Sequence, residues 1–186
     1  MKPLIVYFHG LGSSPRSDKV SALSEAGTVV APSINIDPDI AEAYLDDYLR
    51  LIINTHRKNG GDKVIFVGTS LGGFWAARMG QKWDATQILV NPSMEPEKSL
   101  WKYVGSGYTD YNENVKKSLT YEDIEKFSKY SSDGDLYNRH FFIAEHDPVV
   151  TPCFIPDYHP YVRRYDSDDH QGNSFFDDVV SHIISL

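Results

Sequence analysis

Short apolar runs rich in β-branched and aromatic residues alternate along the chain with stretches of helical periodicity. The apolar runs predict buried strands. They lie at residues 4–8, 28–31, 64–67, 86–90, 141–144 and 161–165. Helices are predicted between and after them, at residues 19–26, 37–59, 74–79 and 174–184. This alternation predicts an α/β fold whose mostly parallel, doubly wound sheet is covered by helices on both faces.

The longest predicted helix has clear signals at both ends. Asp37 before Pro38 is a favourable N-cap, and Asn59-Gly60-Gly61 ends the helix. Helical spacing places one set of residues on a common face. The set is Ile40, Tyr44, Tyr48, Leu51, Ile52 and Thr55. We therefore expect an amphipathic helix with this face as its apolar side.

Residues 93–139 interrupt the alternation of strands and helices. This insertion is rich in Tyr, Ser, Lys, Glu and Asp, and it contains no strand-like run. Its length and its place between two strands predict a cap over an active site, within a single domain that comprises residues 1–186. The alternative is a solvated helical excursion without a part in catalysis.

Aromatic residues of the insertion are candidates for a substrate pocket. Tyrosine rings line an apolar acyl pocket well while their hydroxyls stay hydrated or hydrogen-bonded. We expect Trp101, Tyr103 and Tyr108 to contact the substrate. The alternative is that these rings pack a small core of the insertion itself.

The most informative motif is Gly68-Thr69-Ser70-Leu71-Gly72, which follows the apolar run 64–67 and precedes a helical stretch. Strand, tight turn and helix are the context of a nucleophile elbow, in which the serine hydroxyl projects above the sheet. Gly68 and Gly72 leave space where a Cβ would collide with neighbouring elements. The motif predicts Ser70 as a nucleophile. The alternative is a turn that only joins a strand to a helix.

A serine nucleophile needs a base and an acid that orients it, and in this kind of fold both follow the serine, the acid first. Asp147 stands in the loop after the strand at 141–144, and His170 stands in the loop before the last helix. We expect Asp147 and His170 to complete a triad with Ser70. Other acids compete less well because of their place in the sequence: Glu145, Asp166, Asp168 and Asp169. The other histidines do not follow the strand-end pattern: His9, His56, His140, His146, His159 and His182.

Backbone N–H groups are expected to form the oxyanion hole. One belongs to Leu71, directly after the nucleophile, and the other to Leu11, in the Gly/Ser loop after the first strand. Neither zinc-type His spacing nor paired cysteines occur, so we expect no metal and no cofactor. Cys153 has no assigned base, and we interpret it as inert.

Composition narrows the class of partner. The 186 residues suit one domain, and the net charge of −8 argues against nucleic acid as a partner. No apolar run could span a membrane, and the N-terminus lacks the features of a signal peptide. A single cysteine fits a reducing compartment, so we expect a cytoplasmic protein that acts on a small molecule. The sequence does not indicate an oligomeric state.

Several stretches together resemble the small α/β-hydrolase-fold esterases of the YqiA/YcfP type. They span nearly the whole chain: His9-Gly10-Leu11-Gly12-Ser13-Ser14-Pro15-Arg16-Ser17, the serine motif, Asn91-Pro92, and the loops of Asp147 and His170. The resemblance implies a compact α/β-hydrolase fold with a Ser-Asp-His triad. It also implies esterase or thioesterase activity on short to medium acyl groups. Two departures are Ser167-Asp168-Asp169 before His170 and an insertion with only a faint likeness.

These observations predict a serine hydrolase that cleaves acyl esters or thioesters through an acyl-enzyme intermediate. A competing hypothesis is a catalytically lapsed hydrolase fold that serves as a binding module, since a fold does not fix a function. Acyl transfer and amide hydrolysis on the same three residues are further alternatives.

Overall fold

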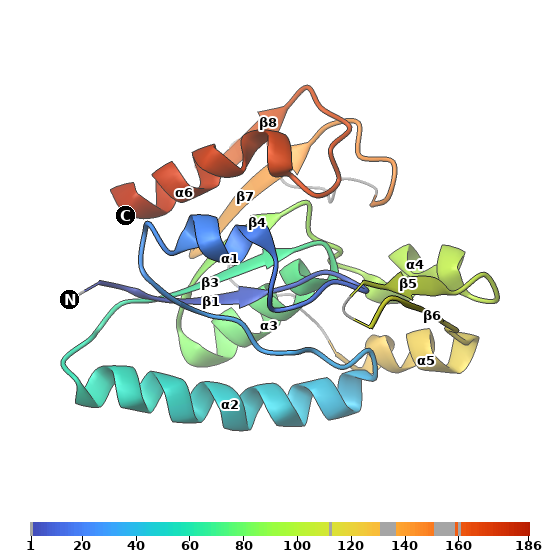
Figure 1. Ribbon diagram of the computed structural model, residues 1–186, viewed down its shortest axis with the longest axis horizontal. Helices are drawn as coiled ribbons and strands as arrows, with labels where there is room; N and C mark the ends of the chain where they lie inside the picture. The colour runs from blue at the N-terminus through green and yellow to red at the C-terminus, as the bar shows by residue number, and fades with distance from the viewer. Residues whose placement is uncertain (1, 112, 131–136, 151–158, 160) are drawn as a thin grey trace.

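The predicted strands assemble into one parallel sheet in the computed structural model of the protein, as Figure 1 shows. The structure describes residues 2–111, 113–130, 137–150, 159 and 161–186. Within these residues the sheet has six strands in the order β2-β1-β3-β4-β7-β8. The strands are β1 (Leu4–Phe8), β2 (Thr28–Val30), β3 (Val64–Thr69), β4 (Thr86–Val90), β7 (Arg139–Ala144) and β8 (Val162–Tyr165). All neighbouring pairs in this sheet are parallel.

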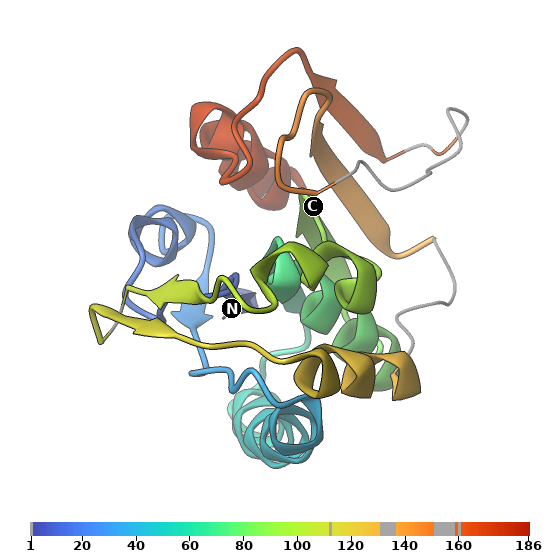
Figure 2. The same cartoon turned by 90° about the vertical axis from the view of Figure 1, so that its right-hand side faces the viewer.

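Helices cover both faces of the sheet, as expected for strands that are apolar on both sides (Figure 2). They are α1 (Asp18–Leu23), α2 (Pro38–Lys58), α3 (Leu71–Trp83) and α6 (Phe176–Ser185), the last preceded by the 3-10 turn η3 (Asn173–Phe175). Successive residues of β1 point to opposite faces of the sheet. Val6 packs in a cluster with α2 and α3, and Tyr7 packs in a second cluster with α1 and α6. The predicted α/β-hydrolase type of sheet is therefore confirmed.

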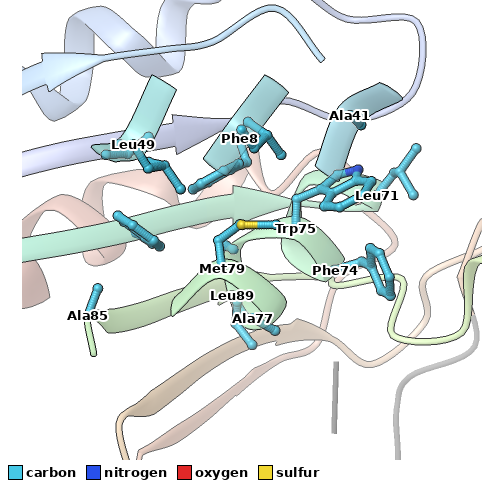
Figure 3. Packing of buried hydrophobic residues seen from close by; sticks show 14 of the residues in the cluster. Phe8, Ala41, Leu49, Leu71, Phe74, Trp75, Ala77, Met79, Ala85 and Leu89 are labelled. Atoms are coloured by element: carbon cyan, nitrogen blue, oxygen red, sulfur yellow. The ribbon is translucent and has the colours of Figure 1, made fainter. Parts of the chain in front are cut away.

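The first cluster is centred on α3, whose sequence is apolar nearly all round. Trp75 and Met79 are fully buried together with Phe8 of β1 and Leu49 of α2 (Figure 3). Each fully buried side chain of this size stabilises the fold by about 2 kcal/mol relative to an exposed one. The helix that begins at the serine motif is therefore firmly fixed in the core.

Helix α2 begins and ends as predicted, but it packs through a different face. The Asp37 carboxylate caps it by accepting hydrogen bonds from the Asp39 and Ile40 backbone N–H groups at 2.9 and 3.4 Å. The residues that are buried on the sheet are spaced by four: Ala41, Leu45, Leu49 and Ile53. Ile40 and Leu51 of the predicted face are 54% and 67% exposed. The prediction is therefore wrong, because the buried face is displaced from the predicted one by one residue, about 100° around the helix axis. Small Ala41 lets the helix approach the sheet, whereas the tyrosines tolerate exposure.

The insertion, residues 93–139, contains a hairpin that the sequence did not indicate. Strands β5 (Tyr108–Asp110) and β6 (Val115–Lys117) pair in antiparallel fashion. Both are short and mostly exposed, which is why neither has an apolar run. Short helices and turns complete the insertion: α4 (Pro96–Ser99), η1 (Trp101–Tyr103), α5 (Tyr121–Glu125) and η2 (Lys126–Lys129).

The insertion packs against α3 through its buried residues. The ring of Phe127 lies 5.7 Å from Phe74 and 6.3 Å from Trp75, between ring centroids. Leu100, Leu119 and Ile124 belong to the same core cluster as α3. The insertion is thus continuous with the core on the side of the sheet that α2 and α3 cover.

Candidate active site

The serine motif forms a strained turn between β3 and α3. Ser70 has φ 57° and ψ −124°, a backbone conformation that costs energy for any residue with a Cβ. The surrounding backbone holds it: the Ser70 N–H donates to the Val90 carbonyl at 3.0 Å, and the Ser70 carbonyl accepts from the Gly73 and Ser93 N–H groups at 2.8 and 2.9 Å. The predicted strand–turn–helix geometry is therefore confirmed.

Both predicted glycines are required by close backbone approach. A Cβ on Gly68 would lie 2.1 Å from the Gly72 carbonyl oxygen, and a Cβ on Gly72 would lie 2.0 Å from the Phe8 carbonyl oxygen. These partners are backbone atoms that cannot rotate away. The start of α3 is thus pressed against the ends of β3 and β1, and this contact sets the position of Ser70.

The structure brings Ser70, His170 and Asp147 into one hydrogen-bonded chain. His170 Nε2 lies 2.9 Å from Ser70 Oγ, and His170 Nδ1 lies 2.7 Å from Asp147 Oδ2. The side chains of His170 and Asp147 are only 11% and 3% exposed. In neutral His170 this arrangement has Nδ1–H donating to the carboxylate, while Nε2 accepts a hydrogen bond from the Ser70 hydroxyl.

Asp147 is held as an ion by its surroundings. Its other oxygen, Oδ1, accepts hydrogen bonds from the Val149 and Val150 N–H groups at 2.7 and 3.1 Å. Burial raises the pKa of this carboxyl, but the His170 ring and the two N–H groups lower it by more, so the pKa lies below its ordinary value. A carboxylate is therefore available to stabilise a protonated His170.

The competing acids and histidines have other contacts. Asp166 Oδ1 lies 3.0 Å from the exposed His146 ring. The Asp169 carboxylate accepts hydrogen bonds from the backbone N–H groups of Gln171, Gly172 and Ser174, so it shapes the loop that carries His170. His182 is half-buried, and its Nε2 lies 2.6 Å from Nδ1 of His140.

Asn91 contacts the loop of His170, a role that the Asn91-Pro92 motif in the sequence did not indicate. Its amide Nδ2 donates to the Asp169 and His170 carbonyls at 3.0 Å each, and its Oδ1 accepts from the Ala144 N–H at 2.7 Å. The residue is 3% exposed and has φ 42°, which asparagine tolerates better than most residues. Asn91 thus ties the histidine loop to the end of β7, from which the Asp147 loop continues.

The two residues predicted to supply the oxyanion donors border the same small cavity of about 50 Å³. Leu11 and Leu71 both line it. Leu71 is the first residue of α3, where backbone N–H groups have no intrahelical acceptor. A Cβ on Gly10 would lie 3.3 Å from Ser70 Cβ, so the loop that carries Leu11 passes directly beside the serine.

His9 braces this loop rather than acting as a base. Its Nδ1–H donates to the Gly10 carbonyl at 3.0 Å, and its Nε2 accepts from the Ile34 N–H at 3.3 Å. Burial lowers the pKa of His9, which keeps the ring neutral and the two contacts intact.

A larger cavity of about 560 Å³ opens above Ser70 and His170, and we call it the Ser70 cavity. The insertion supplies a large part of its wall, including Tyr103 and Tyr108. Trp101 does not line it. Its ring is 56% exposed and packs edge-to-face on Tyr121, with 5.0 Å between centroids, so the prediction for Trp101 differs from the structure.

The remaining predictions concern metal ions, membrane-spanning helices and Cys153. Among the described residues, no group of three or more His, Cys, Asp and Glu side chains is arranged to hold a metal ion. No helix in the described ranges is long and apolar enough to cross a membrane. Cys153 lies outside the described residues.

Solved structures with this architecture include hydrolases of low sequence identity. Est1E of Butyrivibrio proteoclasticus superposes with a TM-score of 0.65 at 13% identity and covers 98% of this chain and 86% of that chain. The Pyrococcus furiosus esterase PF2001 superposes with a TM-score of 0.59 at 14% identity and covers 98% and 80%. At such identities the likeness shows the fold alone.

Sequence relatives place the chain more narrowly. A UPF0227 protein of Yersinia pseudotuberculosis is 27% identical over 184 residues, which cover 94% of this chain and 92% of that protein. Residues 4–132 match the family described as the uncharacterised protein family UPF0227. The resemblance noted in the sequence is thereby confirmed, and the chain belongs to the UPF0227 family, with an α/β-hydrolase fold.

Proposed function

We propose that the protein is a serine hydrolase that cleaves carboxylic esters or thioesters of small molecules. The observation that carries the proposal is the chain of hydrogen bonds from Ser70 Oγ through the His170 ring to Asp147, with 2.9 and 2.7 Å between the bonded atoms. Similar proteins support it as well, since one neighbour of the same fold is described as an esterase.

In the proposed reaction, Ser70 Oγ attacks the acyl carbonyl carbon while His170 Nε2 takes the serine proton. The Asp147 carboxylate stabilises the imidazolium that results and keeps the ring in its orientation. The carbonyl oxygen becomes an oxyanion, which the N–H groups of Leu11 and Leu71 stabilise. One such donor contributes about 3 kcal/mol to transition-state stabilisation in hydrolases of this type.

Collapse of the tetrahedral intermediate breaks the bond to the alcohol or thiol, and His170 Nε2 returns the proton to this leaving group. An acyl group is then bound to Ser70. Water attacks the acyl carbon, His170 accepts a proton from the water, and a second collapse releases the acid and regenerates Ser70. Every proton in the cycle passes through His170 Nε2, which is the ring nitrogen that faces Ser70.

The direct test is covalent labelling with a fluorophosphonate, which reacts only with an activated serine. We expect one label per protein, located on Ser70, and complete loss of labelling in Ser70→Ala. Ser21→Ala, which removes an exposed hydroxyl from α1, is the control and keeps full labelling. A 4-nitrophenyl ester is then expected to give a burst of nitrophenol equal to the enzyme concentration when deacylation is slow.

The competing hypothesis of a lapsed hydrolase predicts a folded protein that is not labelled and does not turn over esters. The acidic Asp168-Asp169 stretch before His170 would favour this hypothesis if its carboxylates hindered an anionic substrate. The Asp169 carboxylate is directed into its own loop by three backbone N–H groups, so it does not obstruct the serine. Unlabelled Ser70 in a protein with the expected thermal unfolding transition would favour the binding module and exclude the proposal.

A further inference from the structure

The wall of the Ser70 cavity is mixed rather than apolar, because polar and charged residues stand beside apolar ones such as Leu11, Leu100 and Val150. Four serine side chains line it besides Ser70: Ser13, Ser93, Ser99 and Ser106. Two lysine residues line it as well, Lys102 from η1 and Lys116 from β6. Aspartate and glutamate are absent from the residues that line it. The described wall is therefore cationic in a chain whose net charge is −8.

Neither lysine forms an ion pair with a carboxylate of the described residues. Lys102 Nζ donates to the Val149 carbonyl at 2.6 Å, and within the described part of the chain no carboxylate oxygen lies within ion-pair distance of Lys102 or Lys116. The carboxylate of Asp147 acts on Lys102 through its charge, and it already accepts hydrogen bonds from His170 and two backbone N–H groups.

Other lysines of the insertion differ in this respect. Lys98, Lys117, Lys126 and Lys129 each bind a carboxylate. Burial lowers the pKa of the Lys102 ammonium, and the Asp147 carboxylate opposes this shift. A partly desolvated cation without an ion-pair partner gains energy when a bound anion approaches it.

The neighbouring cavity on the other side of the β5–β6 hairpin has the opposite character. It holds about 540 Å³ and is lined by Asp110, Glu113 and Lys117. Lys117 Nζ lies 2.6 Å from Asp110 Oδ2 and 3.1 Å from Glu113 Oε2, so its charge is more than balanced there. Of the two cavities, only the one that contains Ser70 presents uncompensated positive charge.

We infer that the substrate of the Ser70 cavity is an anionic ester, which carries a carboxylate or phosphate group away from the scissile bond and binds it at Lys102 and Lys116. This inference rests on the proposed function, because it assigns a substrate class to the same site. The cavity hydroxyls suit the remaining polar atoms of such a molecule.

Two matched pairs of esters test the inference, because the anion can lie on either side of the ester bond. Monophenyl adipate and phenyl hexanoate share the leaving group and differ by a carboxylate on the acyl side. 4-Acetoxybenzoate and its methyl ester differ by a carboxylate on the leaving group, and their rate constants are divided by those of hydroxide hydrolysis. In at least one pair we expect kcat/KM to favour the anionic ester by about 5-fold to 25-fold, since an exposed ion pair contributes up to about fivefold.

Variants assign the preference to the two lysines. Lys116→Gln and Lys102→Gln are each expected to lower the ratio of anionic to neutral kcat/KM by about fivefold, and the double variant to abolish the preference. Lys98→Gln is the matched control, because it removes a charge from the same insertion outside the cavity wall. That variant keeps the wild-type ratio. Raising the salt concentration from 0.05 to 0.5 M reduces the ratio in the wild type.

Turnover of the neutral esters at least as fast as of the anionic ones in both pairs overturns the inference and leaves the proposed function standing. A preference that persists in the double variant also overturns it, because the charge that selects the anion then lies elsewhere. Absence of turnover for all four esters, together with an unlabelled Ser70, overturns the proposed function and the inference with it.

Discussion

The two walls of the Ser70 cavity are built on different principles. The wall formed by β3, α3 and the loop after β1 is held by backbone contacts: a Cβ on Gly72 would lie 2.0 Å from the Phe8 carbonyl oxygen. The wall formed by the insertion mixes polar and apolar residues, and its Gly107 lies against the insertion's own backbone, where a Cβ would be 2.5 Å from the Lys117 carbonyl oxygen. Gly105, which precedes the lining residue Ser106, stands in open space, and a Cβ there would meet nothing within 4 Å. Both walls contribute residues to the same cavity.

This difference separates two tasks. The first wall fixes the atoms that would react, and small displacements there change the reaction geometry. The second wall faces the rest of the substrate, and its side chains are free to vary without disturbing the sheet. We therefore expect substitutions in the first wall to cost stability and rate, and substitutions in the second to change mainly which substrate is preferred.

The largest difference between the walls is expected for glycine to alanine substitutions. Gly72→Ala should lower the free energy of unfolding by about 3 kcal/mol, because its Cβ overlaps backbone atoms of Phe8 and His9. Gly105→Ala is the matched control. It has φ 76° and open space around the Cβ position, so only the left-handed backbone costs energy, about 1 kcal/mol.

Urea unfolding followed by tryptophan fluorescence measures both values. Equal losses for the two variants would contradict the idea that close backbone approach makes Gly72 harder to replace than Gly105. A larger loss in Gly105→Ala would reverse the comparison.

The next effect concerns Asn91, which we predict to be a positioning residue. Asn91→Asp keeps the oxygen that accepts from Ala144 but replaces the NH₂ group that donates to the Asp169 and His170 carbonyls. The loop that carries His170 then loses two hydrogen bonds and faces like partial charges. We expect kcat to fall about 10-fold to 100-fold with little change in KM, and the free energy of unfolding to fall by about 2 kcal/mol.

Asn114→Asp is the matched control, since Asn114 also has a positive φ, 55°, but lies exposed in the hairpin of the insertion. Its effect on stability should stay within about 0.5 kcal/mol. If Asn91→Asp lowered stability and left kcat unchanged, its amide would be a structural group without influence on His170.

His140 of β7 and His182 of α6 form a pair of neighbouring rings that makes the free energy of unfolding depend on pH. Burial, together with smaller effects of the neighbouring His182 and His159 rings, lowers the pKa of His140 to about 4. His140 also stacks on Tyr161 with 4.1 Å between centroids, and burial together with the charge of Arg163 lowers the pKa of His182. His140 is thus neutral in the folded protein at neutral pH.

Between pH 6.5 and about 4 the unfolded chain binds a proton that folded His140 does not, so stability falls as pH falls through this range. The loss attributable to His140 should be about 2 kcal/mol and should level off at lower pH. His140→Phe keeps a ring beside Tyr161 and should flatten this part of the curve. His146→Phe is the control, because it replaces an exposed imidazole by a phenyl ring. An equal flattening of the curve in both variants would contradict the assignment to His140.

Local rules account for what the sequence predicted well. Glycines two residues before and after Ser70 indicate a tight turn, because larger residues at Gly68 and Gly72 would collide with neighbouring backbone. Asp147 and His170 could be predicted because parallel strands bring their carboxyl ends to one edge of the sheet. The same reasoning placed the Asp37 cap of α2 correctly.

Features that depend on contacts between distant segments could not be predicted. Asn91 stands at a strand end like many loop residues, and only the packed structure shows the three groups that its amide meets. Lys116 lies on a strand too short and polar to be recognised, so its approach to the cavity was invisible. The apolar face of α2 was misjudged because tyrosines count as apolar in a pattern yet tolerate water in the structure.

The smallest effect is expected for Trp101, and it divides the aromatic residues of the insertion. Tyr103 lines the Ser70 cavity, whereas Trp101 lies outside it and packs on Tyr121. Trp101→Ala should lower stability by about 1 kcal/mol, the value of an edge-to-face pair, and should not change the preference among esters of different acyl length. Tyr103→Ala should change that preference by a factor that grows with acyl length, at most about fourfold per methylene group in contact with the ring. Thermal unfolding and kcat/KM for acetate, butyrate and hexanoate esters measure the two effects. A change in chain-length preference in Trp101→Ala, with none in Tyr103→Ala, would mean that the insertion presents its other face to the substrate.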